Sequence, residues 1–155
     1  MQIVKLPIKD LLPHEELSQQ RLVDLMRRVE NDKVQRRPIV VSRIGEKFLI
    51  VDGHHRVGAL KQLGYPNVLA MVIDFYLTDR VSVRGWSSDD QYDKGVIIER
   101  ALRGDLYPPY TTKHLVRLDE GEWEPFHHHS ILEPEMNISL EELGRKSAQS
   151  KLVRV

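Results

Sequence analysis

The segment 51–56, Val-Asp-Gly-His-His-Arg, constrains the fold more than any other stretch of this sequence. Two β-branched runs, 38–41 and 48–51, lie on either side of a Gly-containing turn and predict a β-hairpin. Residues 54–63 then repeat apolar side chains at helical spacing, and Gly64 supplies a stop signal. The sequence therefore predicts that a buried strand passes directly into a helix at residues 52–53.

Such a junction is suited to binding an anion. The first N–H groups of a helix lack intrahelical partners and carry the positive end of the helix dipole. Gly53 lets a phosphate approach the backbone, and Arg56 can hold phosphate oxygens in a bidentate fork. Asp52 either caps the helix, orients a histidine or faces a metal-bound nucleotide. A plain turn with solvated histidines is the alternative, but four polar groups in one junction favour a phosphate site.

Two further segments carry polar groups suited to chemistry. Leu12–Leu17 places Glu15 just before a predicted helix, where a carboxylate serves either as a general base or as a partner of the helix dipole. Pro108–His114 gathers two hydroxyls, an ammonium and an imidazole, which suit a phosphate or a carboxylate, although a loop running into a polar strand fits equally well. Trp86 either stacks on a ligand or covers the core, and taken alone the core role is favoured.

The rest of the pattern predicts a single α+β domain with a short appendage. Helices are expected over about 19–31, after the N-cap Ser18, and over 92–102. Further strands are expected over 2–6, 68–74, 81–83 and 113–118. The domain is expected to end at residue 118, and 119–155 to form an appendage with a short helix starting near Ser139.

Composition excludes several classes of protein. The absence of cysteine rules out a disulfide scaffold, a thiolate nucleophile and a Cys-ligated metal site. Equal numbers of basic and acidic residues, 23 each, argue against a dedicated DNA-binding domain. No apolar run is long enough to span a membrane, and the N-terminus lacks the pattern of a signal peptide, so we expect a cytoplasmic protein. The run His127–His129 is interpreted as surface rather than as a metal site. The arginines and lysines of 27–37 are interpreted as a solvated helix face, with a nucleic-acid patch as the less favoured alternative.

The three polar segments, taken in order, resemble the ParB/sulfiredoxin-like fold, and within it the free L-serine kinases. The matching patterns are Pro-His-Glu at 13–15, Asp-Gly-His-His-Arg at 52–56 and Pro-x-x-Thr-Thr-Lys-His, which ends at His114. The resemblance runs from about Leu6 to His114. It implies a ParB/sulfiredoxin-like domain with a small mixed sheet and flanking helices. Sulfiredoxin activity is excluded, because it needs a catalytic cysteine.

The resemblance also implies a role for each residue. Glu15 would take the proton from the serine hydroxyl, with Asp52 and His55 also catalytic. The nucleotide phosphates would be held by Asp52, Gly53, His54, His55 and Arg56. The amino-acid substrate or the product phosphate would be held by Trp86, Thr111, Thr112, Lys113 and His114. Mg²⁺ would arrive on the nucleotide phosphates, with no direct side-chain ligand.

The sequence therefore predicts a small-molecule kinase that transfers a phosphate from ATP or ADP to free L-serine, L-threonine or a similar hydroxy amino acid. Positioning and charge stabilisation are the main requirements of this chemistry, and neither a Walker A nor a protein-kinase motif is present. The alternative is a ParB-like nucleotide-binding regulator or DNA-binding module without kinase activity. It is disfavoured by the neutral charge and by the lack of a helix-turn-helix after the nucleotide domain. A nucleic-acid partner and a membrane are not expected.

Overall fold

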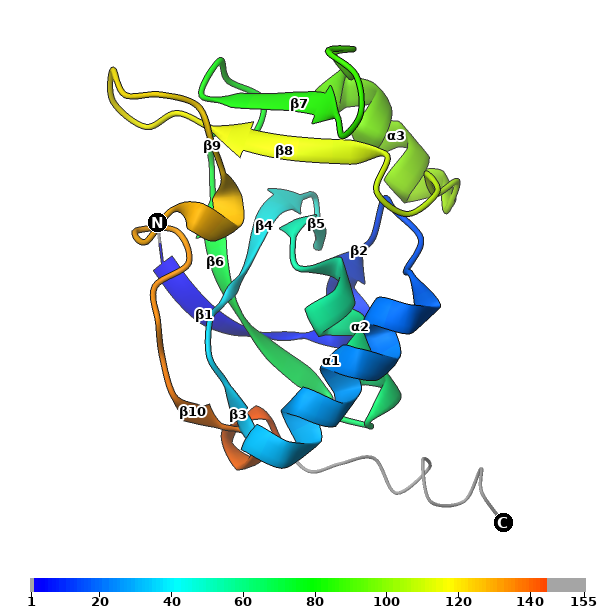
Figure 1. Ribbon diagram of the computed structural model, residues 1–155, viewed down its shortest axis with the longest axis vertical. Coiled ribbons are helices and arrows are strands. Elements are labelled where there is room, and N and C mark those ends of the chain that lie inside the picture. Colours follow the sequence, from blue (N-terminus) through cyan, green and yellow to red (C-terminus); the bar gives the residue numbers. More distant parts are fainter. Residues whose placement is uncertain (1, 145–155) are drawn as a thin grey trace.

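A five-stranded mixed sheet forms the centre of the structure, a computed structural model that describes residues 2–144 (Figure 1). In spatial order its strands are β1 (Gln2–Pro7), β6 (Asn67–Ile73), β4 (Ile39–Ile44), β5 (Lys47–Asp52) and β2 (Leu11–Leu12). β6 pairs with β4, and β5 with β2, in parallel, whereas the other two pairings are antiparallel. The predicted hairpin and the mixed sheet are confirmed.

The sheet is covered on both faces because its central strands alternate two sets of apolar side chains. Val41 and Ile50 join Val57 and Leu60 of α2 (His54–Gln62) in one core cluster. The neighbouring Val40 and the strand residues on its face belong to a second cluster, on the opposite side. Helix α1 (Gln19–Asp32) packs beside α2, and the two appear side by side in Figure 1. It begins as predicted, at the N-cap Ser18, whose hydroxyl accepts the Arg21 N–H at 3.4 Å.

A second, antiparallel sheet lies over the other face. It consists of β7 (Val81–Gly85), β8 (Thr112–Val116) and β9 (Glu124–Pro125). Helix α3 (Lys94–Arg103) packs beside it and begins at Asp93, whose carboxylate accepts the N–H groups of Gly95 and Val96. Val83 of β7 and Ile97 of α3 are buried together in a small third cluster. The helix predicted over 92–102 is thus confirmed. Because Asp93 is its N-cap, the first helical residue is Lys94 rather than residue 92.

The chain after residue 118 folds back over the domain. It forms the 3₁₀ turn η2 (Phe126–His128), the strand β10 (Ile138–Ser139), which pairs with β3 (Val34–Gln35), and the 3₁₀ turn η3 (Leu140–Leu143). A further short 3₁₀ turn, η1 (Ile8–Asp10), follows β1. Phe126, Leu132 and Leu143 are at most 1% exposed. The division at residue 118 stays a prediction. The described part of the expected appendage contributes directly to the core, and residues 145–155 lie outside the described part.

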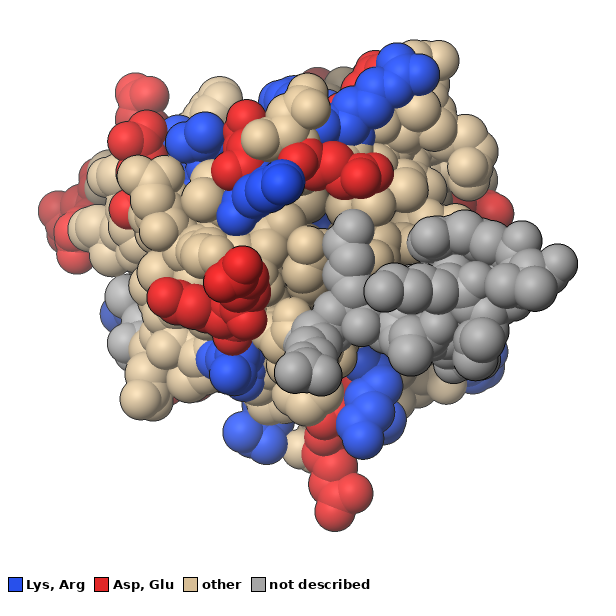
Figure 2. All heavy atoms as spheres, turned by 90° about the horizontal axis from the view of Figure 1, so that it is seen from below, with Lys and Arg blue, Asp and Glu red and all other residues tan. Residues whose placement is uncertain are grey.

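The described surface has a mixed charge distribution where Figure 2 shows it. On that face, seen from below relative to Figure 1, acidic and basic side chains alternate and neither sign forms a continuous field. Within residues 2–144, no helix combines the length and the apolar character needed to cross a bilayer.

Candidate functional site

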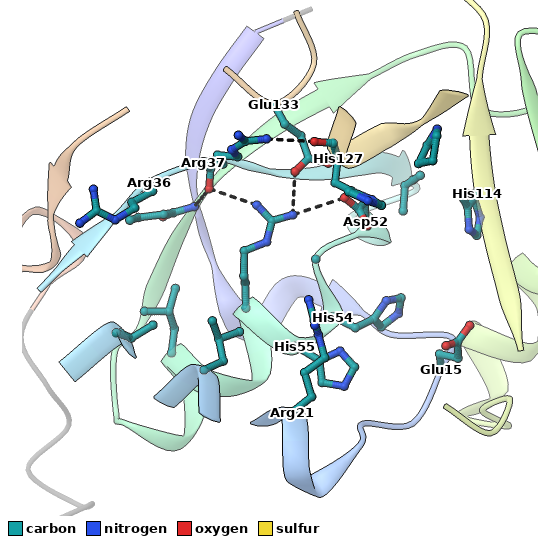
Figure 3. A pocket seen from close by; sticks show the side chains of 18 of the residues that line it. Glu15, Arg21, Arg36, Arg37, Asp52, His54, His55, His114, His127 and Glu133 are labelled. Atoms are coloured by element: carbon teal, nitrogen blue, oxygen red, sulfur yellow. Dashed lines mark hydrogen bonds and ion pairs between the residues drawn. The ribbon is translucent and has the colours of Figure 1, made fainter. Parts of the chain in front are cut away.

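A pocket of about 630 Å³ opens between α1, α2, β8 and the returning C-terminal segment. Its volume is within the range usual for small-molecule sites. Figure 3 shows Glu15 and His114 at one end and Arg36 at the other, with Asp52 and His54 between them. Ten of the eleven residues predicted for the site line this pocket. The exception is Thr111, whose hydroxyl donates to the Pro108 carbonyl at 2.8 Å, so its predicted substrate contact stays a prediction.

The start of α2 forms one wall of the pocket. Its N-cap is Gly53, with φ of +114°, and no side chain caps the helix. A Cβ at Gly53 would lie 2.5 Å from a side-chain carbon of Ile39, so both the backbone angle and the packing require glycine. The first N–H groups of an α-helix have no intrahelical acceptor, and here residues 53–56, which carry them, line the pocket without a side-chain cap. This is the geometry expected of a phosphate-binding turn.

The two histidines of this turn accept hydrogen bonds from the segment 14–18. His54 Nε2 accepts the backbone N–H of His14 at 3.1 Å, and His55 Nε2 accepts the backbone N–H of Ser18 at 3.0 Å. An Nε2 that accepts a hydrogen bond leaves the ring hydrogen of a neutral imidazole on Nδ1. Burial lowers the pKa of both rings, and for His55 the charge of Arg21 lowers it further. Both are therefore neutral side chains that fix the segment 14–18 against the phosphate-binding turn.

Glu15 is held at the opposite wall by the loop before β8. Tyr107 N–H donates to the His14 carbonyl at 2.9 Å, and Glu16 N–H donates to the Tyr107 carbonyl at 2.8 Å. This bridge brings the Glu15 carboxylate to the loop, where Oε1 accepts the Tyr110 N–H at 2.8 Å and Oε2 accepts the Thr112 N–H at 3.0 Å. Tyr110 has φ of +61°, a conformation that non-glycine residues seldom adopt. The loop is thus shaped around the carboxylate.

A buried polar chain continues behind Glu15. The Thr112 hydroxyl donates to Glu15 Oε2, so its oxygen is left to accept from His14 Nε2, which lies 3.3 Å away. His14 is 1% exposed, and burial lowers its pKa to about 4. His114 shares a hydrogen bond of 2.9 Å with the Tyr76 hydroxyl, and burial holds its pKa well below the usual value. These rings form a neutral, dry backing for the carboxylate.

Trp86 and Lys113 border the same end of the pocket. The Trp86 indole N–H donates to the Thr112 carbonyl at 3.1 Å, and its side chain remains half exposed. The Lys113 ammonium lies 5.1 Å from the centre of the Trp86 ring, within cation–π distance. Of the two roles considered for Trp86, the structure favours an exposed wall of the pocket over a core position.

Arg56 differs most from its predicted role. Its Nη2 donates to Glu133 Oε1 at 2.9 Å and to Asp52 Oδ2 at 3.4 Å, and its Nη1 donates to two backbone carbonyls. Both terminal nitrogens of the guanidinium thus bind acceptors of the protein, and the phosphate contact predicted for Arg56 stays a prediction. Burial beside the Asp52 carboxyl raises the pKa of Glu133 to about 9. Burial also acts to raise the pKa of Asp52, but Glu133 and the charge of Arg56 outweigh it and lower that pKa.

Sequence reasoning missed several residues of the pocket. Arg21 lines the pocket and was not singled out from the sequence. Arg28 and Arg36 also line it, although the basic residues of 27–37 were interpreted as a solvated helix face. The spacing of Arg21, Leu25 and Arg28 places all three on one side of α1 and would have indicated a shared face. His127 also lines the pocket, and it is exposed, as expected for the run 127–129. No sequence pattern indicated that Glu133 belongs to the pocket, because it lies in an irregular acidic segment.

Part of the pocket lining is apolar and consists of Leu25, Val29, Val34, Leu60 and Leu140. The same lining includes the charged residues Arg28, Asp32 and Arg36. The pocket thus combines apolar surface, arginines and the Glu15 carboxylate. Among the described residues, no group of three or more histidine or acidic side chains is arranged to hold a metal ion.

Comparisons with known proteins agree with this architecture. Over 85 residues the chain is 44% identical to an ATP-dependent L-serine kinase of Staphylothermus marinus, covering 54% of this chain and 33% of the relative. Over 105 residues it is 31% identical to an ADP-dependent L-serine kinase of Thermococcus kodakarensis, covering 66% of this chain and 43% of the relative. The chain thus spans less than half the length of these curated relatives.

A solved structure supports the fold over nearly the whole chain. A free serine kinase in complex with AMP superposes with a TM-score of 0.74, at 17% identity, over 91% of this chain and 93% of that one. The predicted α+β, ParB/sulfiredoxin-like architecture is confirmed. The sequence model of the ParB N-terminal domain matches residues 1–87, which include both Glu15 and the turn 52–56. On this match, the chain belongs to the ParB N-terminal domain family.

Proposed function

We propose that the protein is a kinase that transfers a phosphate from ATP or ADP to the hydroxyl of free L-serine. One observation carries the proposal: a carboxylate fixed by three donors, Glu15, shares a pocket with the uncapped start of α2. A phosphoryl transfer needs a group that accepts the hydroxyl proton and a site that holds the phosphates. The names of the curated relatives and the AMP complex of the fold neighbour support this choice of reaction.

The phosphates are assigned to the middle of the pocket. There the N–H groups at the start of α2 offer directed donors, and Arg21 adds a positive charge from α1. The apolar part of the lining suits a nucleobase, and this assignment directs the transferable phosphate toward Glu15. Base, phosphates and acceptor would then follow one another along the pocket.

The hydroxy amino acid is assigned to the end that holds Glu15. Its hydroxyl approaches the carboxylate, which takes the proton as the bond to phosphorus forms. Lys113, Trp86 and the hydroxyl-bearing loop surround this end and offer a cation and an aromatic face to the zwitterion or the product phosphate. Threonine or a similar hydroxy amino acid would use the same groups.

Mg²⁺ fits this site as an ion carried by the nucleotide. The ion usually keeps several waters and binds substrate phosphates with few protein carboxylates. The anion-binding turn and the arginines are suited to the phosphates that would hold it. When bound, it neutralises charge on the transferring group. We further infer that the protein acts in the cytoplasm.

The proposal is tested by ³¹P NMR of the protein with Mg²⁺ and L-serine, using ATP in one tube and ADP in another. A phosphomonoester resonance that coincides with added O-phosphoserine supports the proposal and identifies the donor. Serine-independent nucleotide hydrolysis alone, or no product with serine, threonine and other hydroxy amino acids, would overturn it. Titration with duplex DNA at several salt concentrations then tests the DNA-binding alternative.

A further inference from the structure

A buried acidic side chain from the C-terminal segment reaches the phosphate-binding turn. Glu133 is 1% exposed, and its Oε1 accepts from Arg56 Nη2 at 2.9 Å. The same nitrogen lies 3.4 Å from Asp52 Oδ2, a longer and weaker contact. Figure 3 shows Glu133 and Asp52 on the same side of the pocket. Arg56 Nη2 therefore bridges Glu133 and the carboxylate of the turn, with the shorter contact to Glu133.

The other end of the guanidinium fixes a second segment. Arg56 Nη1 donates to the carbonyls of Arg37 and Pro38, at 3.3 and 2.9 Å. Its Nη2 would lie 3.1 Å from a Cβ at Gly53, so the side chain packs directly against the backbone of the turn. Arg56 thus links the phosphate-binding turn, the connection before β4 and the C-terminal segment.

A second set of contacts joins the connection before β4 to the C-terminal segment. Arg37 Nη1 donates to the His127 carbonyl at 2.9 Å, and Arg37 Nη2 lies 3.7 Å from Glu135 Oε1. The Glu135 contact is exposed to solvent, so little stabilisation is expected from it. The buried Glu133–Arg56 pair is the contact that reaches the phosphate-binding turn itself.

We propose that Glu133 is a positioning residue for nucleotide phosphates. By holding Arg56 against the connection before β4, it sets the place of residues 52–56. This inference rests on the proposed function, which supplies the nucleotide. Glu133 lies beyond residues 1–87, the part that the ParB N-terminal domain matches. The C-terminal segment is therefore part of the nucleotide site.

Calorimetric titration with ATP and with ADP tests the proposal directly. Replacing Glu133 with leucine keeps its approximate volume but removes the acceptor, and we expect the nucleotide Kd and KM to rise at least tenfold. The KM for serine and kcat should change less than threefold. Glu133→Gln should stay within threefold of the wild-type Kd, because its amide oxygen accepts the same hydrogen bond. Glu135→Ala, which removes only the exposed contact, is the matched control and should bind as the wild type does.

Any other result would contradict either the positioning role of Glu133 or the proposed kinase function. A Glu133→Leu variant with a lower Tm but an unchanged nucleotide Kd would show that the residue only stabilises the fold. A Glu133→Gln variant as weak as Glu133→Leu would exclude the acceptor role. If the leucine variant does not fold, Glu133→Asp, one methylene short of Arg56, replaces it with the same expectation. A wild type that binds nucleotide without making O-phosphoserine overturns the kinase proposal alone, whereas one that binds no nucleotide overturns both.

Discussion

Thr112 donates twice to the same oxygen of Glu15, once from its backbone N–H at 3.0 Å and once from its hydroxyl. The other carboxylate oxygen accepts the Tyr110 N–H at 2.8 Å. A carboxylate held by three donors has one orientation and little freedom to rotate. This arrangement favours a group that must meet an incoming hydroxyl, since catalytic bases depend on geometry first.

The Glu15→Gln variant should lose catalytic activity but still bind nucleotide. Its amide cannot accept the serine proton, so kcat should fall by about 10²–10⁴-fold, the usual contribution of a general base. The nucleotide phosphates are assigned to the start of α2, so the nucleotide Kd should remain within about threefold. Steady-state kinetics and calorimetry measure the two quantities.

Glu16→Gln is the matched control for this variant. Glu16 is the next residue and also acidic, but its side chain is exposed and lies outside the pocket. Its turnover should equal that of the wild type. Parallel losses of nucleotide binding and turnover in Glu15→Gln would instead assign Glu15 a structural role.

The hydroxyl of Thr112 should matter more than its methyl group. Thr112→Val keeps the shape but removes the donor to Glu15 and leaves His14 Nε2 without its partner. A lost hydrogen bond to a charged group corresponds to about 1.5–3 kcal/mol, so kcat should fall about 10–100-fold. Thr112→Ser retains the hydroxyl and should recover most of the rate. Equal kcat in the valine and serine variants would contradict this role.

The order of elements could be predicted from the sequence because local signals agree with the tertiary structure. The hairpin, α2 and the N-cap of α1 each follow from residues close in the chain. The two-residue strands β2, β3, β9 and β10 could not, since strands so short carry no period. Their pairing depends on distant partners, such as β10 returning to β3 across about a hundred residues.

Candidate site residues could be predicted where a short sequence motif contains residue types suited to the chemistry. Glu15, Asp52, Gly53 and Thr112 all reach the pocket, as their motifs indicated. The partners of Arg56 could not be predicted, because they include Glu133, 77 residues away, and two backbone carbonyls. Sequence spacing shows that a guanidinium lies near a phosphate-binding turn, but not whether the protein already uses its donors.

Arg21 should support nucleotide binding through its charge. It projects from α1 into the pocket, close enough to lower the pKa of His55. Arg21→Gln should raise the nucleotide Kd about tenfold, as expected for the loss of one charge-assisted contact to phosphate. Arg27→Gln, an exposed residue of the same helix outside the pocket, should leave the Kd unchanged. Equal Kd values for both variants would remove Arg21 from the phosphate site.

Buried histidines should make the fold sensitive to mild acid. Burial lowers the pKa of His14 to about 4 and lowers those of His54 and His114 well below 6.5. The unfolded chain therefore binds more protons on these residues than the folded chain does, and stability should fall as the pH drops from about 6.5 to 4. For His14 alone the shift corresponds to about 3 kcal/mol. Glu133, with its raised pKa, opposes this trend but is one group against three.

Thermal unfolding between pH 7.5 and pH 5 measures this dependence, and Tm should decrease toward pH 5. His128→Gln is the control, since His128 is exposed and should leave the pH profile unchanged. A Tm that is constant or rises over this interval would show that the three rings are not kept neutral by burial.

Glu133→Gln should gain stability relative to the wild type as the pH rises. The pKa of Glu133 is raised from its ordinary 4.5 to about 9, so above pH 4.5 the wild type must take up a proton on folding. This cost grows with pH, by at most about 1.4 kcal/mol per unit, whereas glutamine has no such cost. Urea unfolding at pH 5, 6, 7 and 8 should therefore show a widening difference in unfolding free energy. Glu135→Gln, at the exposed position, should give a flat difference. A difference for Glu133→Gln that stays constant or narrows would mean that Glu133 is ionised in the fold, with Arg56 as a full counter-charge.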